Sequence, residues 1–268
     1  MRILLIIGDQ PRHYYLANKI CRKFNNVCIV VEKRNSLKYK LKKNYSSLDK
    51  VNFNQHFNDR DKLEKKYFTG EGIKFSNKIY KFKNINIEMQ KFVSIFNEFK
   101  PQILITFGCG IIKEPILSKI PKYSLNFHTG LLPYFKGTAG NFWPFYFLKP
   151  NYVGITIHKI ERKLDSGPIM HQSIPRLDPS DGIHDVACKA ICKGVDDLVS
   201  ILLNISNGKK PIFVRQRSIG KLFSDKDFSP QHLRLIYNLF KNKVVKYFLN
   251  NQLQKDRPQT IRINYEKN

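Results

Sequence analysis

Residues 103–137 read ILITFGCGIIKEPILSKIPKYSLNFHTGLLPYFKG, and this stretch decides the expected fold. Ile103–Phe107 is an apolar run of strand length that enters the loop Gly108–Gly110. Ser124–Phe127 is a second short strand, and the loop after it begins at His128. Successive strands that end at loops of this kind indicate an open α/β sheet, in which ligands bind beyond the carboxyl ends of the strands.

The sequence before this stretch predicts the beginning of a parallel sheet. Arg2–Ile7 and Val27–Val31 are apolar runs of strand length, and a helix is expected between them at about residues 12–24. The order strand, helix, strand favours parallel pairing. The polar and basic stretch that follows has one helix expected near Arg60–Tyr67, and apolar residues at helical spacing predict another at Ile87–Phe99.

The sequence after it completes the expected fold. We expect a helix at Asn141–Leu148, strands at Val153–Ile160 and Ile169–Ile174, a long amphipathic helix at Asp181–Ile205, and one more helix at about Pro230–Phe248. Ser180 is the expected N-cap of the long helix, and Gly208 lies just past its end. Together these features predict an α/β fold: a Rossmann-like, mostly parallel sheet with flanking helices at residues 1–208, followed by a small C-terminal extension at residues 209–268.

Three polar residues near the strand ends have the chemistry for acyl transfer to an amine. Asn126 and His128 alternate along one strand, so their side chains point to one face. Asp165 follows in a turn that Gly167 and Pro168 hold in shape. Asn126 and a protonated His128 can donate to a developing oxyanion, while Asp165 keeps His128 charged or helps to remove the proton of the amine. Taken alone, an Asn-x-His pair also fits a structural histidine.

The loop after His128 adds a family context. Residues 125–137 closely resemble the signature of the folate-dependent formyltransferases, which reads Asn-x-His-x-Ser-Leu-Leu-Pro, a short basic or aromatic stretch, and Gly. Gly154–Thr156 and Leu164–Pro168 match the strand and the turn that follow in that family. The resemblance covers about residues 103–205. It implies N-formyl transfer from N10-formyltetrahydrofolate, with the Asn, His and Asp named above as the catalytic residues.

The resemblance also implies where the two substrates bind. The residues expected to bind folate are Phe107, Gly108, Cys109, Gly110, Ile111 and Leu164. On the residues alone, the two glycines of this loop also fit a simple tight turn. Thr129, Tyr134 and Lys136 are expected to bind the acceptor, because an aromatic ring and a cation can stack on a base or sugar and neutralise phosphate. Gly130 departs from the family, which usually has Ser there, so that hydroxyl is missing.

The formal charge of the 268 residues is +26, from 47 Lys and Arg against 21 Asp and Glu. A nucleic-acid partner would explain this charge, but a general bias toward Lys explains it as well. Local basic runs such as Lys38–Lys43 and Lys241–Lys246 contain no recognisable nucleic-acid motif. We therefore do not expect nucleic acid as a partner, whereas an anionic small substrate such as a nucleotide would be attracted by the field.

The cysteines and the apolar runs bear on metal binding and location. The five cysteines form no Cys-x-x-Cys pair and are expected to be free thiols. His184, Cys188 and Cys192 share one helix face, but core packing explains them better than a metal, so no metal is expected. No apolar run approaches the roughly 20 residues of a membrane span, and the N-terminus does not resemble a signal peptide. A cytoplasmic protein without membrane contacts is expected.

The residues after Gly208 bear on the acceptor. Methionyl-tRNA enzymes of this family need a C-terminal tRNA-binding barrel, and glycinamide ribonucleotide enzymes end near the long helix, so neither resembles this chain best. The nucleotide-sugar N-formyltransferases do, which implies a nucleoside-diphosphate-linked amino sugar, such as a dTDP-4-amino-4,6-dideoxyhexose, used for surface polysaccharides such as a lipopolysaccharide O-antigen. The alternatives are an enzyme that resembles methionyl-tRNA formyltransferase and a non-catalytic basic RNA-binding relative. A homodimer is left open.

Overall fold

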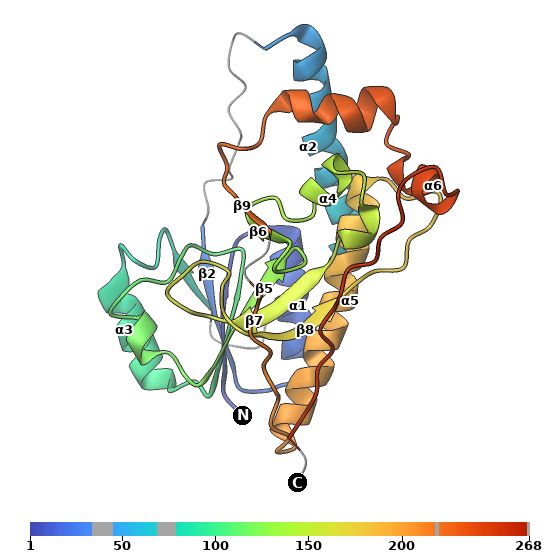
Figure 1. Ribbon diagram of the computed structural model, residues 1–268. Helices are drawn as coiled ribbons and strands as arrows, with labels where there is room; N and C mark the ends of the chain where they lie inside the picture. Colours follow the sequence, from blue (N-terminus) through green and yellow to red (C-terminus); the bar gives the residue numbers. More distant parts are fainter. Residues whose placement is uncertain (34–44, 69–78, 218–219, 267–268) are drawn as a thin grey trace.

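A computed structural model describes residues 1–33, 45–68, 79–217 and 220–266 (Figure 1). Its main strands are β1 (Ile3–Ile7), β2 (Val27–Glu32), β3 (Ile79–Phe82), β4 (Ile103–Phe107), β5 (Tyr123–Thr129), β7 (Ile155–Lys159) and β8 (Ile169–Ser173). They form a seven-stranded sheet in the order β3-β2-β1-β4-β5-β7-β8. The pairs from β3 to β5 are parallel, whereas β7 is antiparallel to both β5 and β8. The expected mostly parallel α/β sheet is confirmed.

Helices cover both faces of the sheet. Alternate residues of β1 belong to two separate hydrophobic clusters, and all five are fully buried. The first cluster includes the apolar faces of α1 (Pro11–Cys21) and α5 (Ile183–Ser206), and the second includes that of α3 (Met89–Phe99) (Figure 1). A strand that is buried on both faces appears in the sequence as a continuous apolar run, which is why β1 is easily recognised.

Helix α2 (Ser47–Phe68) is much longer than the helix expected near residues 60–67. The reason is that part of its buried face is polar, with Asp49, Asn52 and His56 all buried. In that order they bond to Arg234 (2.6 and 2.7 Å), Asn238 (2.7 Å) and Tyr237 (3.0 Å). Hydrophobic periodicity cannot reveal such a face, because its partners lie far away in the sequence.

The residues after Gly208 share structure with the main sheet domain. Strand β9 (Lys221–Phe223) pairs in parallel with β6 (Phe135–Gly137), and neither strand was expected. Gln172 of β8 donates its backbone N–H to the carbonyl of Ile261 (2.8 Å), so the tail lies along the edge strand. The boundary at residue 208 stays a prediction, but the segments on its two sides form one connected core.

The prediction of one helix at residues 230–248 is wrong. These residues form a 3₁₀ turn (Pro230–His232), a π-helical turn (Leu235–Leu239) and the short helix α6 (Val244–Leu249). Asn242 interrupts the expected helix with a φ of 58°, and its side-chain oxygen accepts the N–H of Ile183 (3.0 Å) at the beginning of α5. Ser180 is therefore not the N-cap of α5; Gly182 occupies that position, and Asn242 supplies the acceptor.

Two further observations concern the helices. The helix expected at residues 141–148 is reduced to α4 (Trp143–Tyr146), with Leu148 at a φ of 56°. Within the described ranges, no helix is both long and apolar enough to cross a bilayer.

Candidate active site

The sheet register brings the polar residues of the site together. Asn126 on β5 lies beside Thr106 on β4 and beside His158 on β7. The hydroxyl of Thr106 donates to Oδ1 of Asn126 (2.9 Å), so the amide nitrogen faces the other way. That nitrogen lies 3.1 Å from Nε2 of His158, whose Nδ1 is 2.8 Å from the carbonyl of Lys159. The hydrogen of His158 therefore belongs on Nδ1, and Asn126 presents a hydrogen-bond donor to the site.

Asp165 is the point on which the other side chains converge. Its Oδ1 lies 3.5 Å from Nδ2 of Asn126 and 3.6 Å from both Nδ1 of His128 and Nε2 of His158. Its Oδ2 accepts the backbone N–H of Gly137 (2.8 Å). The three expected catalytic residues are thus brought together, and His158 joins them. Sequence reasoning missed His158, although strand alternation at residues 153–160 could have placed it on the face of the site.

A residue of the C-terminal segment holds the turn that carries Asp165. Asp165 has a φ of 50°, a left-handed conformation that is uncommon outside glycine. The side-chain amide of Gln216 donates to the backbone carbonyls of Asp165 (2.9 Å) and Gly167 (2.7 Å). Both amide hydrogens of Gln216 therefore fix this turn. No motif marks Gln216, since its partners lie about 50 residues earlier.

The charges of the buried pair differ from the expectation. Burial opposes the charge of Asp165, but His128, His158 and the N–H of Gly137 outweigh it and lower the pKa of Asp165 to about 2. For His128, burial lowers the pKa, and the nearby Asp165 only partly offsets this. The expectation of a protonated His128 is therefore not met in the free protein. Its Nε2 lies 3.1 Å from the carbonyl of Phe135, which favours the tautomer with hydrogen on Nε2 and leaves Nδ1 facing Asp165.

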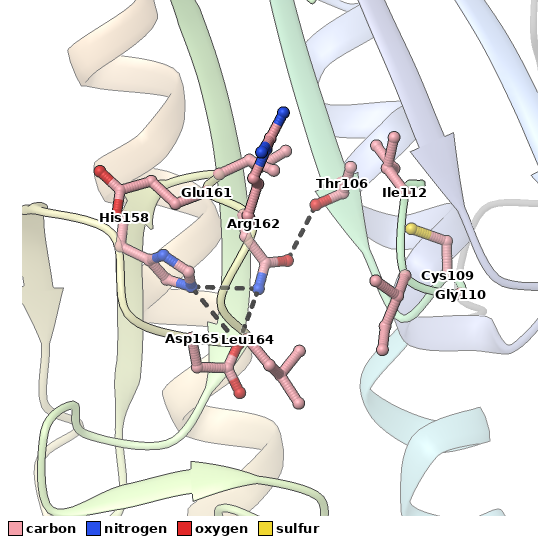
Figure 2. Close-up of a pocket in the computed structure, with 12 residues that line it drawn as sticks. Thr106, Cys109, Gly110, Ile112, His158, Glu161, Arg162, Leu164 and Asp165 are labelled. Carbon is pink, nitrogen blue, oxygen red and sulfur yellow. Dashed lines mark hydrogen bonds and ion pairs between the residues drawn. The ribbon is translucent and has the colours of Figure 1, made fainter. Parts of the chain in front are cut away.

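An open cleft lies beside these residues. It is lined by Thr106, Cys109, Gly110, Ile111, Ile112, Asn126, His158, Ile160, Glu161, Arg162, Leu164 and Asp165. Figure 2 shows Cys109, Gly110 and Ile112 on one side of the gap and Leu164 with Asp165 on the other. Of the residues expected to bind folate, Cys109, Gly110, Ile111 and Leu164 line the cleft.

The other two residues of that expected set lie behind the cleft. The ring of Phe107 is buried edge-on against His13 and Phe127. Gly108 has a φ of 66°, and a Cβ there would lie 2.1 Å from the ring of His13. Both residues therefore shape the loop and do not line the cleft.

The cleft suits a flat heteroaromatic ring. Ile111 and Leu164 on its two walls are 57% and 42% exposed, unusually high for large apolar side chains beside a buried polar centre. Polar side chains of Thr106, Asn126 and Asp165 line the same cleft. Apolar walls with a few polar groups at the base are typical of small-molecule sites. The residues present therefore fit a reduced pterin.

The residues expected to bind the acceptor do not line this cleft. The hydroxyl of Tyr134 accepts the backbone N–H of Gln259 (3.2 Å), and its ring packs on Tyr152, so it helps to anchor the tail. Lys136 lies in β6 beside the Gly137 that contacts Asp165, and Thr129 ends β5. The acceptor roles of Thr129, Tyr134 and Lys136 stay predictions.

The structure explains why position 130 is a glycine. Its φ is 144°, and a Cβ at this position would lie 3.0 Å from both Nε2 of His128 and the carbonyl of Phe135. The hydroxyl of Thr156 on β7 donates to the carbonyl of Gly130 (2.7 Å) and accepts the N–H of Leu132 (3.0 Å). The loop is thus tied down from β7, and a side chain at position 130 would press on His128.

The His and Cys residues of α5 pack in the core. The ring of His184 packs at a tilt against that of His56, with centroids 4.4 Å apart, and burial raises the pKa of the Cys188 thiol. Within the described part of the chain, no group of three His, Cys, Asp or Glu residues is placed to hold a metal ion.

Comparison with known proteins identifies relatives. The sequence pattern of the formyl transferase family matches residues 1–201. A methionyl-tRNA formyltransferase from Caldicellulosiruptor saccharolyticus is 30% identical over 122 residues, which are 44% of this chain and 38% of that protein. The chain thus spans less than half the length of such curated relatives.

Solved structures with a similar fold include two further formyltransferases. Phosphoribosylglycinamide formyltransferase from Anaplasma phagocytophilum has a TM-score of 0.56 at 15% identity, over 84% of this chain and 98% of that one. The formyltransferase PseJ from Anoxybacillus kamchatkensis, in complex with UDP-4,6-dideoxy-4-formamido-L-AltNAc and tetrahydrofolate, has a TM-score of 0.51 at 19% identity, over 91% and 96% of the two chains. At these identities the similarity shows the fold alone.

Proposed function

Since this chain belongs to the formyl transferase family, we propose that it transfers a formyl group to the primary amine of a nucleoside-diphosphate-linked amino sugar. N10-formyltetrahydrofolate is the formyl donor of the family. The observation that carries the proposal is the convergence of Asn126, His128 and His158 on one oxygen of Asp165, at the end of a cleft that fits a pterin.

We assign a separate role to each catalytic side chain. Asn126 is fixed by Thr106 with its N–H groups toward the site, so it can donate to the formyl oxygen as negative charge develops there. The neutral His128 can accept the proton of the attacking amine on Nδ1. The cation formed in this way has the carboxylate of Asp165 at Nδ1 and the carbonyl of Phe135 at Nε2. Asp165 therefore favours proton transfer without itself becoming protonated. When the bond between the formyl carbon and N10 breaks, His128 can return the proton to N10, so that neutral tetrahydrofolate leaves.

The acceptor is inferred from the extent of the similarity. The structure of PseJ contains a nucleotide-linked formamido sugar, and its alignment with this chain extends over 96% of PseJ. The methionyl-tRNA enzyme aligns over only 38% of its length, although it is the more similar in sequence. The phosphoribosylglycinamide enzyme aligns over 98% of its own length but over only 84% of this chain, against 91% for PseJ. A nucleotide-sugar acceptor is therefore preferred, and methionyl-tRNA is the second candidate.

Release of tetrahydrofolate tests this proposal. The purified protein and the formyl donor are mixed with dTDP-, UDP- and GDP-linked amino sugars, and in parallel with glycinamide ribonucleotide and charged initiator tRNA. We expect release that depends on one of the nucleotide amino sugars. Release with the tRNA alone would replace the first candidate with the second, and release with none of these acceptors would overturn formyl transfer to any of them.

A further inference from the structure

A buried carboxylate lies behind the cleft, away from the catalytic residues. Glu32 ends β2 and is only 2% exposed. Its Oε1 accepts the backbone N–H of Ile85 (3.1 Å), and its Oε2 accepts that of Gly110 (2.5 Å). Ile85 belongs to the turn between β3 and α3, whereas Gly110 lines the cleft. A single side chain thus connects two loops that follow different strands.

The loop at residues 109–112, hereafter the cleft wall, has a second connection to the same turn. The side-chain amide of Asn86 donates to the carbonyl of Ile111 (2.9 Å), and its oxygen accepts the N–H of Lys113 (3.3 Å). Both of these groups follow directly after the exposed apolar side chain of Ile111 in the chain. Asn86 thus ties the turn to the cleft wall and to Lys113 beside it, while Glu32 connects the two loops from β2, through a buried bond to Ile85 and a part-buried bond to Gly110.

The charge of Glu32 suggests positioning and not simple packing. Burial of a carboxylate is unfavourable unless hydrogen bonds satisfy it, and bonds to an ionised acceptor are shorter and stronger than neutral ones. Gly110 allows the close approach, because a Cβ there would lie only 3.2 Å from Oε2 of Glu32. Two N–H groups directed at one carboxylate restrict where the backbone of the cleft wall can lie.

We propose that Glu32 is a positioning residue for the formyl donor. By holding Gly110 and Ile85 together, it sets the cleft wall opposite Leu164 at the separation that a pterin ring requires. Its contribution is made before the donor binds, so the donor does not have to order this loop itself. This inference rests on the proposed function, since it names the cleft as the donor site.

The test measures binding of folinic acid, a stable formylated folate, by titration calorimetry of the full chain. In Glu32→Gln, an amide NH₂ must face one of the two N–H donors, so one bond is lost without loss of volume. We expect the Kd for folinic acid to rise about tenfold. Amide hydrogen exchange in peptides that span the cleft wall should be faster in the free variant and return toward the wild-type rate when folinic acid is bound.

Glu88 provides a matched control. Its carboxylate accepts the N–H of Lys83 (2.6 Å) in the same turn, but from the side of α3 and not of the cleft. Glu88→Gln should bind folinic acid like the wild type. Should Glu32→Gln fail to fold, Glu32→Asp retains the charge but withdraws the carboxylate, and it should also weaken binding.

The possible failures differ. If the wild-type protein does not bind folinic acid, the proposed donor and this inference both fail. If the wild type binds and the Glu32 variants bind equally well, the inference fails while the proposed function stands. Folinic acid binding that is weakened equally in Glu88→Gln would also overturn the role of Glu32, because the effect would then come from the turn as a whole.

Discussion

Oδ1 of Asp165 lies 3.5 to 3.6 Å from three side-chain nitrogens, and the protonation state of His128 among them decides how the site can work. Burial lowers the pKa of His128, although the ionised Asp165 lies 3.6 Å away. Burial is the largest effect on the pKa of this ring; Asp165 and the carbonyl of Phe135 raise that pKa, and His158 lowers it further. The proposed base therefore has to be neutral in the free protein and cationic only during proton transfer.

This requirement can be measured by NMR titration of the histidine rings, with His128→Asn used to assign the signal. A lowered pKa means that His128 stays neutral at pH 6.5, the ordinary pKa of the side chain, and becomes charged only at lower pH. A ring that is still charged at pH 7 would contradict the proposed base and restore the protonated donor that the sequence favoured.

The sequence was informative for some of these residues and not for others. Asn126, His128 and Asp165 lie within local motifs, so their spacing was enough to find them. His158 reaches the site through pairing of β5 with β7, and Gln216 through a contact across about 50 residues. Such contacts arise from tertiary folding, which no local pattern encodes. The same holds for the charge of His128, because burial is not visible in a sequence.

At the scale of elements, the turn that carries Asp165 depends on the segment after α5. Gln216→Leu removes both donors to the carbonyls of Asp165 and Gly167. We expect kcat to fall by at least about tenfold, because small displacements of a catalytic group are costly. Binding of folinic acid should change little. Gln259→Leu is the control, since only the backbone of Gln259 bonds to Tyr134. Equal kcat values in the two variants would show that the turn holds itself.

The polar face of α2 gives a second prediction at this scale. Asp49 is 1% exposed, and Arg234 binds both of its carboxylate oxygens. Arg234→Met leaves that carboxylate without its cation, so the melting temperature should fall by at least about 2–4 °C, the shift that accompanies 1 kcal/mol in domains of similar size. Lys226→Met, at an exposed position, should melt like the wild type. An unchanged melting temperature in Arg234→Met would mean that the contact between Arg234 and Asp49 does not stabilise α2.

Helices and strands could be predicted where their buried residues are apolar and form a pattern within the element itself. β1, β2 and β4 are continuous apolar runs and were found within a residue or two. β6 and β9 have three residues each and exist only because they pair with one another. The helix breaks at Asn242 because the side chain of this residue caps α5, and that contact is not visible in the sequence of the broken helix. The basic run Lys38–Lys43 lies outside the described residues.

At the scale of the whole molecule, the family pattern ends at residue 201, but the chain continues into the site. The segment after α5 supplies Gln216 and β9, and its tail runs along β8 and α5 (Figure 1). The predicted extension at residues 209–268 is therefore connected to the catalytic turn. Sequence composition could indicate that the residues after Gly208 differ from those before it. It could not indicate that they contact the turn that carries Asp165.

The net charge gives a prediction at the same scale. Both proposed substrates are anionic, and a chain with a formal charge of +26 attracts them over a distance that salt shortens. We expect kcat/KM for the nucleotide sugar to fall as ionic strength rises, while kcat at saturation stays nearly constant. A kcat/KM that does not respond to salt would show that the positive charge is only a bias of composition.

Formyl transfer at this site can be followed with an isotopically labelled formyl group on N10-formyltetrahydrofolate, with the product identified by mass spectrometry. With the wild-type protein we expect a labelled formamide on a nucleotide-linked amino sugar. With His128→Asn, which should still bind folinic acid, most of that product should disappear. A wild-type protein that binds folinic acid yet labels no acceptor amine would show that the chain does not transfer formyl groups to these amines, and a His128→Asn variant that transfers label at the wild-type rate would show that His128 is not the base.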